Sequence, residues 1–375
     1  MHKDLTKSVE KLRDAATEET ASIKPQTPAA RSPISALTSG PLLRILAFFF
    51  LLAVLAFGLD QVFTFGLRRI KSSDFGVSNK IMAGQVNAQI VISGSSRAVC
   101  HYDPRILEQV TGLKTFNIGR NGSQTDMQLA VLKAYLRHNT KPRLVIHNLD
   151  AFSFVTTREV YNPGQYLPYL DEPDIYQALL KVNPSVWKWK YIPLYRYVVE
   201  DMRFTWILGA KGILGLGPRE DYLQGFRPER QRWTGDFERF KSLNPDGIRF
   251  EIEPQGTRDF EELISLCRRQ GIPVLLVYSP VYYEMRGMER NHGEVFSRFH
   301  ELGGRWDAEI WDYSDSPICG RRELFYNSQH LNEEGAGAFS AALAARLITE
   351  RPWESEGHGV PRTRGPIDAS VVQGQ

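Results

Sequence analysis

The pattern of apolar and polar residues divides the chain into a polar start, one long apolar run and a large region of alternating character. Residues 1–40 mix charges with Ala, Ser, Thr and Pro, and they sustain no apolar stripe. Such a segment buries too little apolar surface to offset its ordering entropy, so we expect a disordered tail with at most a transient helix over 8–18. A second disordered tail is expected over 353–375, where Gly, Pro and charged residues return.

The apolar run 45–59 contains no polar side chain and predicts a transmembrane helix. A helix needs about 20 residues to cross the hydrocarbon core, and 42–64 is long enough if Arg44 extends toward the headgroups. A buried core helix and a cleaved signal peptide are the alternatives. We favour an uncleaved single-pass anchor, because the preceding tail is long and no clear small-residue cleavage site follows.

Charge does not decide the orientation of this helix. Basic residues lie on both sides of it, at Lys24, Arg31 and Arg44 before the run and at Arg68, Arg69 and Lys71 after it. The positive-inside rule therefore gives no answer. A short tail before a first membrane helix and a large domain after it commonly place the domain outside. We therefore expect an inner- or plasma-membrane protein with an extracytoplasmic domain, which would be periplasmic in a Gram-negative cell.

From about residue 89, short apolar strands alternate with amphipathic helices. This alternation predicts an α/β fold over 80–352, a three-layer sandwich with a mostly parallel sheet. The predicted strands are 89–92, 114–118, 144–149, 272–278 and 308–313. The predicted helices are 123–138, 260–269 with Thr257 as its N-cap, 293–302 and 333–348.

A helical insert at about 155–255 interrupts the alternation and is rich in Tyr and Trp. Four arginines lie in its second half, at Arg219, Arg227, Arg230 and Arg232. In one interpretation the insert is a helical subdomain whose aromatics fill its own core. In the other it is a platform that stacks sugar rings or rests on the membrane. The sequence does not separate the two.

Composition and charge narrow the class of protein. Charged residues at 24% and apolar residues at 42% are typical of a globular domain. A net charge of +3, without a zinc finger or an RNA-binding signature, argues against a nucleic-acid partner. Cys100, Cys267 and Cys319 lack metal-ligand spacing, and one disulfide among them is allowed but not required. We expect no metal and no organic cofactor.

A serine and a histidine near opposite ends of the domain form the candidate catalytic pair. Ser96 lies in the small-residue turn Gly94-Ser95-Ser96 after the first strand, and open α/β sheets keep their sites at the carboxyl ends of strands. His330 lies just before the closing helix, and its ordinary pKa suits a general base. Because a serine hydroxyl needs such a base to take its proton, we expect the two side chains to meet.

With these motifs in this order, the sequence resembles the SGNH, or GDSL-type, hydrolase superfamily. Its layout is similar to that of membrane-anchored relatives near the alginate O-acetyltransferases and the D-alanyl transfer proteins of teichoic acid systems. The resemblance spans about 89–347, interrupted by the insert. Gly94-Ser95-Ser96 matches the nucleophile turn, with Ser95 where many members have aspartate. The run 117–122 matches the second block, and the resemblance implies that the backbone N–H of Gly122 joins the oxyanion hole.

The other two blocks depart from the family pattern. The last block, Asp-x-x-His, contains His330 but has Asn327 in the place of the aspartate. The third, Gly-x-Asn-Asp, is represented by His147-Asn148-Leu149-Asp150, so Asn148 supplies the oxyanion donor only with a register shift of one. In a serine protease, an Asp-to-Asn change lowers turnover about 10⁴-fold by favouring the wrong histidine tautomer. The acids that could replace this aspartate are Asp150, Asp312 and Asp315.

Three further residues lie beside these blocks. Arg97 follows the candidate nucleophile, where it either orients an anionic substrate or anchors the turn. His101 and His147 flank the first and third blocks, although a lone histidine is more often a satisfied polar residue than part of a site. The glycine-rich stretch 209–217 lacks the Gly-Lys-Ser/Thr ending of a phosphate loop, which indicates a flexible bend.

These features predict a membrane-anchored serine acyl-ester enzyme, an acyltransferase or esterase acting on a cell-envelope or secreted polysaccharide. Its expected partners are the membrane and either a polysaccharide or an acyl-donor protein, with no nucleic acid. The predicted site comprises the catalytic residues Ser96, His330 and Asn327, the oxyanion donors Ser96, Gly122 and Asn148, and the substrate-binding Arg97. The alternative is a catalytically inactive SGNH-like binding or scaffold module in envelope polysaccharide assembly, which Asn327 and the altered third block favour.

Overall fold

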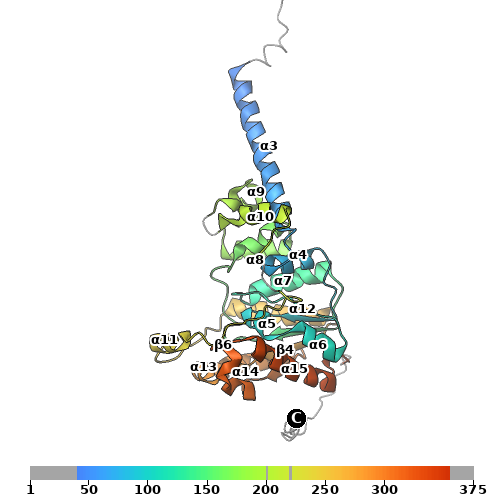
Figure 1. Ribbon diagram of the computed structural model, residues 1–375, viewed down its shortest axis with the longest axis vertical. Helices are drawn as coiled ribbons and strands as arrows, with labels where there is room; N and C mark the ends of the chain where they lie inside the picture. The colour runs from blue at the N-terminus through green and yellow to red at the C-terminus, as the bar shows by residue number, and fades with distance from the viewer. Residues whose placement is uncertain (1–39, 200–201, 219–221, 355–375) are drawn as a thin grey trace, which may run out of the picture. The chain divides into compact units, whose positions relative to one another are not determined.

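The structure, a computed structural model, describes residues 40–199, 202–218 and 222–354 (Figure 1). The predicted helix 8–18 and nearly all of the two predicted tails lie outside these residues. The chain divides into two compact units, Met1–Leu55 and Ala56–Gln375. The first contributes the start of helix α3 (Pro41–Leu67), which is long and apolar enough to cross a membrane. It is slightly longer than the predicted 42–64.

The second unit contains a five-stranded sheet with the order β2-β1-β3-β4-β5, in which every pair of neighbours is parallel. The strands are β1 (Ile90–Ser93), β2 (Thr115–Asn117), β3 (Leu144–Asn148), β4 (Val274–Tyr278) and β5 (Glu309–Asp312). Each lies inside a predicted strand or within one residue of it. The predicted α/β class is therefore confirmed, with the strand order of the flavodoxin-like folds.

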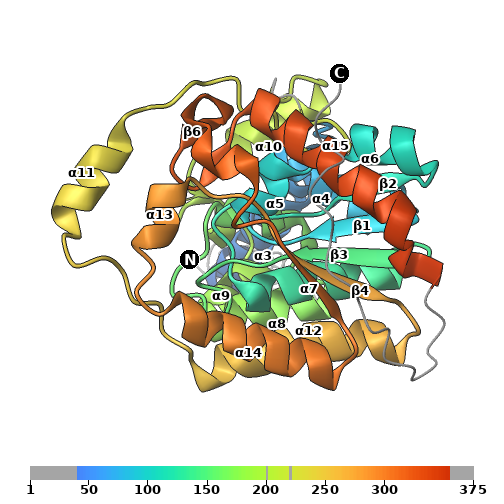
Figure 2. The ribbon, with the colours of Figure 1, turned by 90° about the horizontal axis from the view of Figure 1, so that it is seen from below.

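Helices cover both faces of this sheet and complete a three-layer sandwich (Figure 2). Successive side chains of a strand point to opposite faces, so Val91 of β1 belongs to one core and Ile92 to the other. The first core is covered by α4 (Ser73–Met82), α7 (Thr125–His138), α8 (Pro173–Val182), α12 (Pro254–Arg269) and α14 (His292–Arg305). The second is covered by α5 (Ser96–His101), α6 (Pro104–Thr111), α13 (Tyr283–Gly287) and α15 (Glu333–Glu350).

One predicted helix start is wrong. Helix α12 begins at Pro254, six residues before the predicted 260, and Glu253 occupies the N-cap position. Thr257 lies inside the first turn, where its hydroxyl donates to the carbonyl of Glu253 at 2.9 Å. Proline is favoured at the first helical position because it has no N–H to leave unpaired there, and this signal outweighs the capping preference of threonine.

The insert consists of short helices that extend the core of the domain. They are η1 (Pro163–Tyr169), α8, α9 (Val186–Tyr191), η2 (Tyr195–Tyr197), α10 (Thr205–Ile213) and α11 (Asp236–Leu243). Leu179, Trp189 and Tyr197 are buried in the same cluster as residues of α7 and α12. The insert therefore does not fill a separate core.

After the last helix, Pro352–Glu354 form a short 3-10 turn, and Trp353 packs against the second core.

Candidate active site

Ser96 is the first residue of α5, at the carboxyl end of β1. Strand β1 lies between β2 and β3, where the strand order changes direction, and open α/β sheets bind ligands at such a switch point. The turn before Ser96 requires glycine: Gly94 has a φ of 145°, and a Cβ on it would lie 2.8 Å from the Cβ of Asn148. The side chain of Ser95 caps α5 by accepting from the N–H of Arg97 at 3.2 Å.

His330 reaches this serine from a small antiparallel ribbon formed by β6 (Phe325–Asn327) and β7 (His330–Leu331). Its Nε2 lies 2.7 Å from the Oγ of Ser96, although the two residues are 234 positions apart. The ring of Tyr326 stacks on the imidazole with 5.3 Å between ring centroids. Both Ser96 and His330 keep part of their surface exposed to solvent.

Asn327 fixes the tautomer of His330. Its Oδ1 accepts from two backbone groups, the N–H of Gln329 and the N–H of His330, each at 3.0 Å. Backbone N–H groups only donate, so the atom they converge on must be the oxygen of the amide and not its nitrogen. The same oxygen lies 3.0 Å from Nδ1 of His330. Nδ1 therefore carries the proton, and Nε2 presents its lone pair to Ser96, as a general base requires.

The three acids that the sequence offers in place of an aspartate are engaged elsewhere. Asp150 forms a buried ion pair with Arg97 at 3.3 Å. Asp312 accepts from the N–H of Ser314 at 2.8 Å, and Asp315 pairs with Arg286. Among the described hydrogen bonds, Nδ1 of His330 is paired with Asn327.

Arg97 anchors the nucleophile turn. Its side chain is only 4% exposed, and it donates to the carbonyls of Leu149, at 3.1 Å, and Ser279. Its guanidinium also lies 4.5 Å from the ring centroid of Tyr278. Since these partners follow or end β3 and β4, Arg97 joins the start of α5 to two neighbouring strand ends. The geometry fits the anchoring role, and substrate binding by Arg97 stays a prediction.

Asn148 also belongs to this buried network. Its amide nitrogen donates to the carbonyl of Leu149 and to Oδ1 of Asp150, both at 3.2 Å. Its Oδ1 accepts from the hydroxyls of Tyr102, at 2.8 Å, and Ser279, at 2.7 Å. The Asn148 amide is therefore directed into this buried network, and its role as an oxyanion donor stays a prediction.

The two backbone N–H groups that are predicted to donate to the oxyanion lie in different parts of the fold. The N–H of Ser96 lies in the first turn of α5, where backbone N–H groups have no partner within the helix. Gly122 has a φ of 59° and lies in the loop after β2. That loop is held against the nucleophile turn, because Arg120 N–H donates to the carbonyl of Gly94 at 2.9 Å. The role of Gly122 stays a prediction.

The electrostatics keep His330 neutral. Burial lowers its pKa to about 3, and the positive charges of Arg97 and Arg227 act in the same direction. Arg227 comes from the insert and is held near α5 by a backbone hydrogen bond to the carbonyl of Val99 at 3.0 Å.

Neither Arg227 nor Tyr326 was predicted for the site. Arg227 stood out only as one of several arginines, whereas Tyr326 adjoins Asn327 in the sequence.

His101 and His147, which flank the first and third blocks, are fully buried and differ in their contacts. His101 accepts from the N–H of Leu331 at 3.1 Å and contacts the Ser279 hydroxyl at 2.9 Å through Nδ1. It thereby links α5 to β7, the two elements that carry Ser96 and His330. His147 packs edge-on against Phe260 with 5.9 Å between ring centroids, and neither ring nitrogen has a hydrogen-bond partner.

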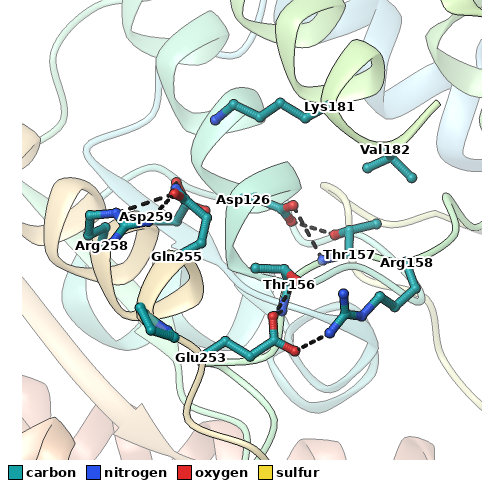
Figure 3. A pocket seen from close by; sticks show the side chains of 11 residues that line it. Asp126, Thr156, Thr157, Arg158, Lys181, Val182, Glu253, Gln255, Arg258 and Asp259 are labelled. Atoms are coloured by element: carbon teal, nitrogen blue, oxygen red, sulfur yellow. Dashed lines mark hydrogen bonds and ion pairs between the residues drawn. The ribbon is translucent and has the colours of Figure 1, made fainter. Parts of the chain in front are cut away.

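The domain also has a cavity of about 660 Å³, whose lining side chains Figure 3 shows. Neither Ser96, Asn327 nor His330 lines it. Its charged side chains largely pair with each other or with neighbours, as Arg158 does with Glu253 and Asp126 with Thr157. The lining residues are Asp126, Thr156, Thr157, Arg158, Lys181, Val182, Glu253, Pro254, Gln255, Arg258 and Asp259.

Together, the fold and the site define an α/β protein with a Ser–His pair at the switch point of its sheet. No protein-family model and no curated protein matches the chain. A crystal structure from Bacteroides fragilis, described as that of a "putative acylhydrolase", is similar over 70% of this chain and 86% of that chain, with 11% identity and a TM-score of 0.33. Similarity at this level carries no functional argument, so the function is inferred from the site.

The buried His147 predicts an acid-sensitive fold. Burial lowers its pKa to about 3, whereas an unfolded histidine titrates near about 6.5. The stabilisation from a neutral His147 is therefore complete above about pH 6.5 and is lost progressively as the pH falls toward about 3. Urea denaturation across this interval should show a smaller loss of stability for His147→Leu than for the wild type.

The exposed His300 provides the matched control, since His300→Leu removes a histidine from the surface. An equally steep loss of stability in the His147→Leu and wild-type proteins would contradict the assignment.

Proposed function

We propose that this protein is a membrane-anchored serine acyl-ester enzyme, an acyltransferase or esterase of the SGNH type. The observation that carries the proposal is the continuous chain of contacts from Ser96 Oγ to His330 Nε2, at 2.7 Å, and from His330 Nδ1 to Asn327 Oδ1, at 3.0 Å. Both contacts have the direction that proton transfer from the serine requires. The resemblance of the nucleophile turn and the Asn-x-x-His block to SGNH motifs supports the same assignment.

In the proposed reaction, Ser96 Oγ attacks the carbonyl carbon of an ester while His330 Nε2 takes the hydroxyl proton. The tetrahedral intermediate is stabilised by the backbone N–H groups of Ser96 and Gly122. Its collapse expels the alcohol, which receives the proton from His330, and leaves an acyl-serine. Water then yields a carboxylic acid, whereas the hydroxyl of a second sugar yields a transferred acyl group. His330 returns to its neutral form in either case.

Asn327 separates two tasks that an aspartate performs together. An aspartate orients the histidine and also stabilises the imidazolium ion that forms during the reaction. Asn327 performs the first task, because its oxygen is held toward Nδ1 by two backbone N–H groups. It cannot perform the second, since it carries no charge. The proposed enzyme therefore has the correct tautomer and a weakened base.

The proposed substrate is an acylated polysaccharide of the cell envelope or a secreted one, with acetyl as the expected acyl group and an acyl-donor protein as a partner in transfer. Helix α3 would anchor the domain to the inner or plasma membrane, with the site on the extracytoplasmic side. A membrane-held catalytic domain suits a polymer that is made or exported at that membrane.

A specific observation favours one second candidate, an inactive SGNH-like binding or scaffold module. No carboxylate contacts His330 among the described residues, and the Asn148 amide is directed into the protein. A degraded site of this kind would keep the fold and lose turnover. Serine reactivity separates this candidate from the enzyme.

A fluorophosphonate probe should label the full-length protein in detergent through Ser96. Fluorophosphonates react with serines that a base has activated, so Ser96→Ala should remove the label and His330→Ala should lower it strongly. Gel fluorescence and mass spectrometry of the labelled peptide measure both effects. Circular dichroism of each variant controls for folding. A folded wild-type protein that takes no label would support the scaffold instead.

Asn327→Asp should increase hydrolysis of a small acetyl ester. The new carboxylate would raise the pKa of His330 and stabilise its imidazolium ion. Because the tautomer is already correct, the gain should stay well below the about 10⁴-fold that separates aspartate from asparagine in a serine protease. The turnover number, measured with p-nitrophenyl acetate, gives the comparison.

Asn327→Ala is the matched variant, since it removes both the charge and the acceptor. It should lower turnover below that of the wild type. Equal turnover in all three proteins would show that Asn327 plays no part in the site.

A further inference from the structure

The insert exposes a group of apolar and aromatic side chains that its own packing does not cover. We define the insert apolar surface as Tyr191, Ile192, Val198, Phe204 and Trp206, which are between 40% and 69% exposed. They come from the end of α9, the residues after η2 and the start of α10. Other aromatics of the insert, such as Trp189 and Tyr197, are buried in the domain core. The exposed set therefore requires a separate explanation.

The segments that carry this surface pack on the last turns of α3, which belong to the same compact unit from Ala56 onward. The ring of Phe63 contacts Tyr197, at 5.5 Å between centroids, and Trp206, at 6.0 Å. The hydroxyl of Thr64 lies 2.9 Å from that of Tyr197. A Cβ on Gly66 would overlap the carbonyl of Gly209 in α10, so this contact admits only glycine. The insert apolar surface is thus held beside the last turns of α3.

The length of α3 places this level at a membrane boundary. With a rise of about 1.5 Å per residue, about 20 residues cross the roughly 30 Å hydrocarbon core, so a span that starts at Pro41 ends near Asp60. Asp60 is 4% exposed and forms an ion pair with Arg196, which shields its charge from lipid. Arg68 and Arg69 are exposed beyond it, where headgroups are expected.

The side chains of the insert apolar surface are also of the types that suit the headgroup region of a membrane. Tyr and Trp are enriched at the level of the headgroups because their rings are apolar and their polar atoms can remain in contact with water. Basic residues lie in the same stretch of sequence, at Lys188, Lys190, Arg203 and Lys211. The charged groups of Lys190 and Arg203 lie over the rings of Tyr191 and Phe204. The only acidic residues between 187 and 217, Glu200 and Asp201, lie outside the described residues. An apolar face flanked by basic residues is typical of segments that lie in the membrane interface.

We infer that the insert apolar surface is a second membrane-contact site, which lies in the interface of the bilayer that α3 crosses. This inference rests on the proposed anchoring by α3 and not on the proposed reaction. A helix alone leaves an attached domain free to tilt and rotate. A second contact at the base of the helix restricts both motions and holds the domain in one orientation toward the lipid.

Lipid quenching of a fluorophore tests this contact in the full-length chain. Val198→Cys and Leu243→Cys are a matched pair, because both side chains are 69% exposed and Leu243 lies at the end of α11, outside the insert apolar surface. The three native cysteines are buried and free, so a bimane maleimide should label the new cysteine selectively. In vesicles of phosphatidylethanolamine and phosphatidylglycerol, doxyl lipids should remove most of the Val198→Cys fluorescence and little of that of Leu243→Cys.

Leu51→Cys, labelled in the same way, reports whether α3 has inserted. Quenching at Leu51 without quenching at Val198 would overturn the second contact and leave the anchor intact. No quenching at either position would overturn both. If Val198 is unquenched in pure lipid but protected from a water-soluble maleimide in native membranes, a membrane protein covers the surface and the lipid assignment is wrong.

Discussion

The guanidinium of Arg97 joins the strand ends around which the site is built. It is buried against Asp150 and donates to carbonyls of Leu149 and Ser279, so the first turn of α5 cannot shift without breaking contacts to the ends of β3 and β4. Removing one partner of a buried pair leaves an uncompensated charge, which typically costs about 3–5 kcal/mol. Arg97 therefore sets the position of Ser96 through the backbone.

His330 is positioned by a different set of contacts. His101 is fixed to the β4 end through Ser279 and accepts from the N–H of Leu331, so it connects the buried network to β7. Asn327 then sets the tautomer from within the same ribbon. Ser96 and His330 are thus held by a frame of surrounding residues, most of which are uncharged. The charged residues of this frame, Arg97 and Asp150, pair with each other. This frame explains how a site can keep its geometry although the expected carboxylate is absent.

Much of this arrangement follows from the sequence, because strands that are buried on both faces read as short continuous apolar runs. All five strands and the location of Ser96 at a strand end were predicted from that pattern. The start of α12 was not, since Pro254 outweighed Thr257. The sequence also left Arg97 with two roles, and the contacts that fit the anchoring role appear only in three dimensions.

The contributions of Arg227 and Tyr326 could not be predicted, because they depend on how the insert and the β6–β7 ribbon fold back over α5. Hydrophobic periodicity carries no information on such long-range contacts. The orientation of the Asn327 amide is a similar case. A sequence shows that asparagine replaces aspartate, but the two backbone N–H groups that orient its oxygen appear only in three dimensions.

Asn327 holds His330 in the tautomer that a general base needs. Nitrogen-15 NMR of the histidine side chains measures this directly, since protonated and unprotonated ring nitrogens have well-separated chemical shifts. With His330 assigned by comparison with His330→Ala, Nδ1 should give the shift of a protonated nitrogen and Nε2 that of a free lone pair. The opposite pattern, with the proton on Nε2, would show that Asn327 does not set the tautomer.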